Sequence, residues 1–260
     1  MKEKKNNKIN KLYLKFIYLL ILTIVYSIPF TIKKTNKKRK DLKKNYYKKN
    51  SSNNYNDSFN SIIDKYKRKT IIYPLPKDIK YKPWMSKNEL IAFSYFMKPG
   101  NIYFEFGSGG STNIASYYKI KTYSVESNAK WHNKLKKNGI KANYITIDLK
   151  AKNLGYPGNN TNMNDWKKYI QAYKNSYNAD IILIDGRFRV ACALDIFSKI
   201  KNDTIILIHD YEPRKEYHIL EKFYIKVNHW DSLALFIKNP DINQIPKSIY
   251  NLYLKEKLIL

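Results

Sequence analysis

Short apolar runs alternate with segments of helical periodicity over the C-terminal two thirds of the chain. Strands are predicted at 102–106, 122–126, 142–148, 181–185, 204–208, 223–227 and 233–238. Helices are predicted between them at 112–119, 128–138, 164–175, 188–200 and 215–222. A further helix precedes the first strand: Ser86 and Glu89 form a capping box at its start, and Pro99-Gly100 ends it.

The runs IILI at 181–184 and TIILI at 204–208 are apolar throughout, which is typical of strands buried on both faces of a parallel sheet. Repeated strand–helix alternation places helices on both sides of such a sheet. We therefore predict an α/β fold for residues 70–260. It is a Rossmann-like three-layer sandwich with a mostly parallel sheet and a C-terminal antiparallel hairpin.

The first 69 residues have a different composition. A basic segment, 1–15, precedes the uncharged run FIYLLILTIVYSIPFTI at 16–32, which has about the minimum length for a bilayer span. Residues 33–69 are rich in Lys and Asn and are predicted to be a disordered linker. We expect a signal-anchor helix and a single-pass membrane protein of the endomembrane system. Cleavage as a signal peptide, giving a secreted or organelle-targeted protein, is the alternative.

The net charge of +28 does not by itself indicate a nucleic-acid partner. Residues 1–69 contain 20 Lys or Arg against 4 Asp or Glu, so much of the excess lies outside the predicted domain. No aromatic-basic motif of a nucleic-acid-binding module is present. The single cysteine, Cys192, excludes an intramolecular disulfide and a cysteine zinc cluster.

The segment YFEFGSGGST at 103–112 is the first candidate site. It reads as a buried strand, a glycine turn and a helix N-terminus at Ser111-Thr112, a layout that brings backbone N–H groups up to a ligand. A dinucleotide fingerprint would require glycine at 107, 109 and 112, and position 112 is Thr. A nicotinamide-dependent reductase is therefore disfavoured.

Each of the five central strands ends in polar residues. Glu126 lies 19 residues after Gly107, close to the separation expected of a carboxylate that binds ribose hydroxyls. Because parallel strands present their carboxyl ends at one edge, we expect these residues to converge on one ligand site. The five ends carry Glu105, Glu126, Asp148, the triplet Asp185-Gly186-Arg187 and the pair His209-Asp210.

The motif E-F-G-S-G-G at 105–110, followed by V-E at 125–126, resembles the class I S-adenosylmethionine-dependent methyltransferases. The resemblance extends from about Ser86 to Lys238. DGRFRVACAL at 185–194 and IHDYEPRKEYH at 208–218 are similar to a poorly characterised methyltransferase-like group. The resemblance implies an enzyme with S-adenosylmethionine as cofactor. Candidate cofactor-binding residues are Glu105, Gly107, Ser108, Gly109, Gly110, Ser111, Thr112, Glu126 and Asp148.

The acceptor side is predicted at the fourth and fifth strand ends, and its candidate catalytic residues are Asp185, Arg187, Arg189, His209 and Asp210, with His218 as a further candidate. Arginines here suit an anionic acceptor, and the acceptor, whether a small molecule, glycan or lipid, is not identified. Two chemistries stay open. Asp185 and Asp210 could hold Mg²⁺, or one carboxylate or His209 could be a general base.

Two functions follow from these observations. The first is a membrane-tethered methyltransferase acting on an anionic or hydroxyl-bearing acceptor. The second is a catalytically inactive methyltransferase-like binding module, because Ser111 stands where many of the resembling proteins have another glycine.

Overall fold

The computed structural model describes residues 79–151, 155–239 and 241–255. The basic segment, the predicted membrane anchor and the linker, at 1–15, 16–32 and 33–69, lie outside these ranges. Within them, no helix has the length and apolar character needed to cross a bilayer.

Seven strands form one sheet with the order β3-β2-β1-β4-β5-β7-β6. The first five pair in parallel and β7 runs antiparallel to both β5 and β6, which confirms the predicted fold class. The order reverses between β1 and β4, and in open α/β sheets ligands bind at that switch point. The strands are β1 Ile102–Phe106, β2 Lys121–Glu126, β3 Asn143–Thr146, β4 Ile181–Ile184, β5 Ile205–Ile208, β6 Tyr224–Trp230 and β7 Leu233–Lys238.

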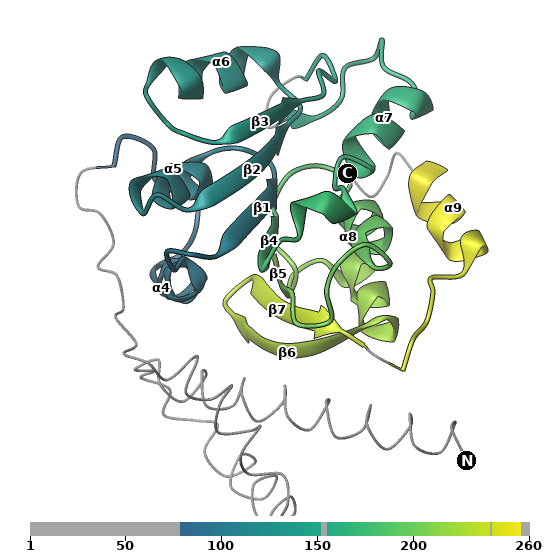
Figure 1. Ribbon diagram of the computed structural model, residues 1–260. Helices are drawn as coiled ribbons and strands as arrows, with labels where there is room; N and C mark the ends of the chain where they lie inside the picture. Colours follow the sequence, from purple (N-terminus) through teal and green to yellow (C-terminus); the bar gives the residue numbers. More distant parts are fainter. Residues whose placement is uncertain (1–78, 152–154, 240, 256–260) are drawn as a thin grey trace, which may run out of the picture. The chain divides into compact units, whose positions relative to one another are not determined.

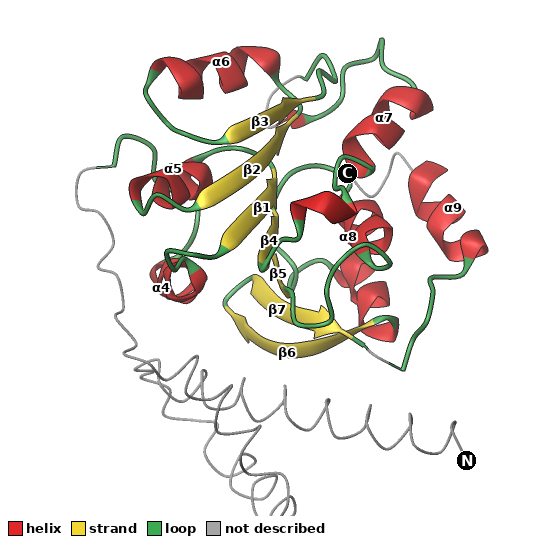
Figure 2. Cartoon of the chain, viewed as in Figure 1, coloured by secondary structure: helices red, strands yellow, loops and turns green. Residues whose placement is uncertain are grey.

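Helices cover both faces of the sheet, as Figures 1 and 2 show. One face carries α4 Lys87–Phe96, α5 Gly110–Tyr117 and α6 Ala129–Lys137. The other carries α7 Met163–Ile170, α8 Arg189–Ile196 and α9 Lys247–Lys255. Two short 3₁₀ helices, Asn175–Tyr177 and Lys215–Lys222, complete the described elements.

Alternation along β1 separates the two layers. Phe104 and Phe106 face the α7 side, where their rings lie 4.9 Å from Tyr173 and 5.8 Å from Tyr169. Tyr103 faces the α4 side, 5.9 Å from Phe93. All three β1 side chains are fully buried, as expected for a central strand.

Several element boundaries differ from the predictions. The helix after the glycine turn begins at Gly110 with Gly109 as its N-cap, ahead of the predicted Ser111-Thr112. The predicted helix at 215–222 is a 3₁₀ helix, and the predicted strand at 142–148 is reduced to β3. Helix α9 was not predicted; it packs against α7 and α8, so its apolar positions complete the core on that face.

Candidate functional site

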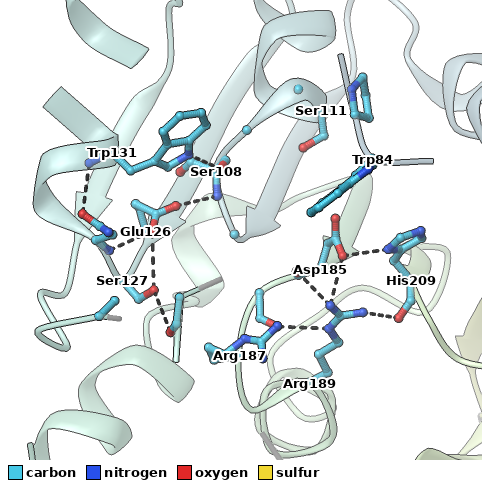
Figure 3. A pocket seen from close by; sticks show the side chains of 18 of the residues that line it. Trp84, Ser108, Ser111, Glu126, Ser127, Trp131, Asp185, Arg187, Arg189 and His209 are labelled. Carbon is cyan, nitrogen blue, oxygen red and sulfur yellow. Dashed lines mark hydrogen bonds and ion pairs between the residues drawn. The ribbon is translucent and has the colours of Figure 1, made fainter. Parts of the chain in front are cut away.

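A cavity of about 1490 Å³ opens at the carboxyl ends of β1, β2, β4 and β5. Figure 3 shows its wall, with Glu126, Ser108 and Trp131 on one side and Asp185, His209 and Arg189 on the other. This volume exceeds the usual range of roughly 300–1,000 Å³ for a pocket that holds one small ligand. The cavity therefore has room for two molecules side by side.

Two glycine turns touch at the switch point. Gly107 has a φ of +96°, and a Cβ on it would lie 2.8 Å from the Cα of Gly186, which follows β4. A Cβ on Gly186 would in turn meet the Tyr169 hydroxyl at 2.1 Å. Glycine is required at both positions because the turns after β1 and β4 pack backbone against backbone.

Gly109 is different, since a Cβ there would find no described atom within 4 Å. Its φ of 177° is ordinary extended backbone. Gly109 lines the cavity, so the open space beside it is ligand space. Neither conformation nor protein packing demands glycine here, and the space beside it fits a ligand lying against the turn.

Glu126 ends β2 in the cavity wall and is 5% exposed. Its carboxylate accepts hydrogen bonds from the backbone N–H of Ser108, at 3.0 Å, and of Asn128, at 2.7 Å. Burial raises the pKa of Glu126 to about 7, although these N–H groups act in the opposite direction. A buried carboxylate with this pKa, fixed to the glycine turn, is poised to accept hydroxyl hydrogens from a ligand.

Glu105 does not line the cavity, which corrects its predicted contact with a cofactor. It is fully buried beneath the turn and accepts hydrogen bonds from Tyr103 at 2.7 Å, Ser111 at 2.5 Å and Ser124 at 2.7 Å. Thr112, also fully buried, donates to the same carboxylate and accepts from the N–H of Gly109. Glu105 and Thr112 therefore shape the turn from behind, whereas Ser111 reaches the cavity wall.

Asp148 is also misplaced by the sequence prediction. It lies beyond the end of β3, exposed, and forms an ion pair with Lys150 at 2.9 Å. The hydrogen bond from Lys150 lowers its pKa. Asp148 does not line the cavity; Ser127 and Asn128, after β2, do so on this side.

Asp185 and His209 meet at the ends of β4 and β5. His209 Nδ1 lies 2.9 Å from Asp185 Oδ1, and Nε2 lies 3.5 Å from Glu89 Oε2 on α4. Burial lowers the pKa of His209, but the hydrogen bond to Asp185 and the charges of Asp185, Asp210 and Glu89 outweigh it, so the pKa is raised. Both ring nitrogens face carboxylates, which leaves Asp185, also in the cavity wall, as the better-placed proton acceptor.

Arg189 occupies the place between Asp185 and Asp210 that the magnesium hypothesis gave to a metal. Its guanidinium lies 3.2 Å from Asp185 Oδ1 and 3.1 Å from Asp210 Oδ2. It also donates to the carbonyls of Asp185, Gly186 and His209. No group of three His, Cys, Asp or Glu side chains among residues 79–151, 155–239 and 241–255 is arranged to hold a metal. These residues do not fit Mg²⁺.

Arg189 is therefore held between two carboxylates in the cavity wall, and its contact with the acceptor stays a prediction. Arg187, two residues earlier in the chain, has a different environment. It is 8% exposed, stacks on Tyr156 at 4.3 Å from the ring centre, and lines the cavity. The other candidate, His218, stacks on Tyr211 at 4.9 Å and does not line the cavity.

Four cavity residues gave no signal in the sequence. Trp131, on α6, donates from Nε1 to the Ser108 carbonyl at 2.8 Å and so fixes the glycine turn. Trp84 is 86% exposed and lies between Ser111 and Asp185 in Figure 3. Tyr156 and Arg214 come from loops whose position depends on tertiary packing. A tryptophan at helical spacing, such as Trp131, predicts only packing. No local sequence pattern marks the other three as cavity residues.

The segment 82–84 forms part of the cavity wall. Gly110 packs directly against it, because a Cβ there would lie 2.1 Å from Pro83 N. Asn113 donates to the Tyr81 carbonyl at 3.1 Å, and the Tyr81 ring packs edge-on against Trp131 at 5.4 Å. These contacts join the chain ahead of α4 to the turn after β1.

The sheet order, the hairpin and the glycine turn define a Rossmann-like fold of the methyltransferase type. A methyltransferase-like protein from Silicibacter pomeroyi DSS-3 superposes with a TM-score of 0.61 and 24% identity, covering 70% of this chain and all of that chain. This likeness confirms the predicted fold. No protein-family model and no curated protein matches the chain.

Two other solved structures align less well. An RNA methyltransferase from Salinibacter ruber, in complex with S-adenosyl-L-homocysteine, has a TM-score of 0.38 and 13% identity over 63% of this chain and 96% of that chain. The methyltransferase PaMTH1 from Podospora anserina, bound to the same molecule, has a TM-score of 0.37 and 13% identity over 81% of this chain and 99% of that chain.

Proposed function

We propose that the protein is an S-adenosylmethionine-dependent methyltransferase whose acceptor carries a hydroxyl or an anionic group. The observation that carries this proposal is the placement of Glu126 in the cavity wall, hydrogen-bonded to the turn that contains Gly109. Glu126 offers acceptors for two ribose hydroxyls. The open space beside Gly109 allows a ligand to lie along the turn.

When bound, S-adenosylmethionine supplies an electrophilic methyl group on a sulfonium. Glu126, Gly109 and Ser111 would hold the cofactor on the β1–β2 side of the cavity, with the Trp131 indole fixing the turn. The second half of the cavity, beyond β4, is left for the acceptor. Positioning the two molecules in one cavity supplies much of the rate enhancement in such reactions.

Asp185 is the group placed to take a proton from an acceptor hydroxyl. His209 and Arg189 both contact its Oδ1, and no described residue donates to Oδ2. These two contacts restrain the carboxylate and leave Oδ2 for the acceptor. His209 acts through Asp185 as a positioning residue, held in turn by Glu89.

Titration calorimetry of the full chain with S-adenosylmethionine tests the proposal. We expect Glu126→Ala to weaken binding by about 1–3 kcal/mol, because two charge-assisted hydrogen bonds are lost. Since the pKa of Glu126 is about 7, the wild-type affinity should fall roughly tenfold from pH 8 to pH 6 as the carboxylate is protonated.

Glu126→Gln is the matched control for that pH dependence, and its affinity should vary less with pH. Absence of binding at millimolar cofactor would remove the proposal. Binding of S-adenosylmethionine without methyl transfer to any member of a broad acceptor panel would favour the inactive binding module.

We also propose that residues 16–32 tether the protein to a membrane, on the evidence of their uncharged sequence alone. The full chain should stay in the membrane pellet on extraction with alkaline carbonate. Deletion of 16–32 should release it to the supernatant. Release of the full chain by carbonate would contradict the anchor, and a shortened N-terminus in the secreted fraction would indicate signal cleavage.

A further inference from the structure

Three arginines line the cavity, and they differ in their partners. Arg189 lies against Asp185 and Asp210, and Arg214 lies 3.3 Å from Asp210. Arg187 has no ion pair with any described carboxylate, and its Nε and Nη1 atoms are buried without a hydrogen-bond partner there. A guanidinium is charged at all physiological pH values, so Arg187 is a buried cation with no counter-charge among the described side chains.

A buried charge without a partner destabilises the folded state unless another group compensates for its lost hydration. An isolated charge taken out of water loses its hydration, and proteins normally pair it. The Tyr156 ring covers one face of the guanidinium, 4.3 Å from its centre. Stacking of that kind leaves the N–H groups in the guanidinium plane available for a planar or tetrahedral anion.

The turn that carries Arg187 is conformationally fixed. Phe188, the next residue, has a φ of +55°, which is unusual for a bulky side chain. Its ring packs against Trp166 at 5.7 Å and Tyr169 at 6.2 Å. Strained backbone held in this way is found at ligand clamps, and it presents Arg187 to the cavity in a set direction.

We propose that Arg187 and Tyr156 form an anion subsite that binds a phosphate or carboxylate group of the acceptor. Its assignment to the acceptor rests on the proposed methyltransferase function, whereas anion binding itself does not. Arg187 follows β4 directly, two residues after Asp185, so an acceptor anchored there would keep its reacting group close to the candidate base.

The test measures the thermal midpoint of the full chain in phosphate, in acetate and in a buffer of equal ionic strength with neither anion. We expect phosphate or acetate to raise the midpoint of the wild type and not that of Arg187→Met. The stronger of the two identifies the anion class. Arg187→Lys should respond weakly, because it keeps the charge without the planar fork.

Arg214→Met is the matched control, since it removes one positive charge from the same cavity and leaves Arg187 in place. It should keep the wild-type response, which separates the subsite from non-specific anion binding by a chain of net charge +28. In anion-free buffer Arg187→Met should melt no lower than the wild type, because it removes an unpaired buried charge.

Equal anion responses in wild type and Arg187→Met would overturn the subsite. A loss of S-adenosylmethionine affinity in Arg187→Met as large as that in Glu126→Ala would overturn its assignment to the acceptor. Anion binding at Arg187 in a protein that binds no S-adenosylmethionine would leave the subsite standing and remove the methyltransferase proposal.

Discussion

Asp185→Asn should lower the rate of methyl transfer by roughly 10²–10⁴-fold, the usual contribution of a positioned general base. Asparagine keeps the size of the side chain and can still accept from His209 and Arg189, but it cannot take a proton. The affinity for S-adenosylmethionine should stay at the wild-type value, because Glu126 and the turn after β1 are untouched. Single-turnover kinetics with calorimetry measures both.

Asp203→Asn is the control for this substitution, since Asp203 is exposed in the turn before β5 and outside the cavity. A rate for Asp185→Asn within threefold of the wild type would exclude Asp185 as the base. Equal loss of rate and of cofactor affinity would instead place Asp185 in the cofactor half of the site.

Gly107→Val should destabilise the domain by roughly 2–5 kcal/mol, from the positive φ together with overpacking against Gly186. From the sequence, this substitution is expected to block the approach of backbone to cofactor. The structure gives a different reason, because the clash is with the protein itself. Thermal unfolding of the full chain and its variant measures the effect.

Gly109→Ala separates cofactor binding from folding. Its backbone is extended and its Cβ would meet no described atom, so the thermal midpoint should be unchanged. The added methyl enters the cavity, and S-adenosylmethionine affinity should fall at least about tenfold if a single buried contact of 1.4 kcal/mol is lost. Normal affinity in Gly109→Ala would show that the turn is not the cofactor site.

Residues at the strand ends could be placed in the site from the sequence, because parallel strands bring their carboxyl ends to one edge of the sheet regardless of loop conformation. Glu126 and Asp185 were placed in this way and lie in the cavity wall. Glu105 was not placed correctly, since it precedes Phe106 and the alternation of β1 points it toward α5. Asp148 was misjudged because β3 ends two residues earlier than its apolar pattern suggests.

The ion pairs of the two arginines could not be predicted from the sequence, for a different reason. Arg187 and Arg189 are two residues apart and have similar local surroundings in the chain. Only the tertiary arrangement gives Arg189 two carboxylates and leaves Arg187 none. Only one contact of Glu89 was predicted from the sequence, its capping box with Ser86, and the structure confirms it. Its contact with His209, which joins α4 to the end of β5, was not predicted.

The part of the cavity wall formed by residues 82–84 affects where the chain can be truncated without losing the site. Helix α4 is the first regular element among the described residues, so a fragment designed on these elements would begin near Ser86. Such a fragment would lose the Lys82–Pro83 packing on Gly110 and the Tyr81 contacts with Asn113 and Trp131. It would keep all the described strands and yet leave the glycine turn uncovered. The smallest intact unit is thus defined by the cavity and includes chain that has no regular structure.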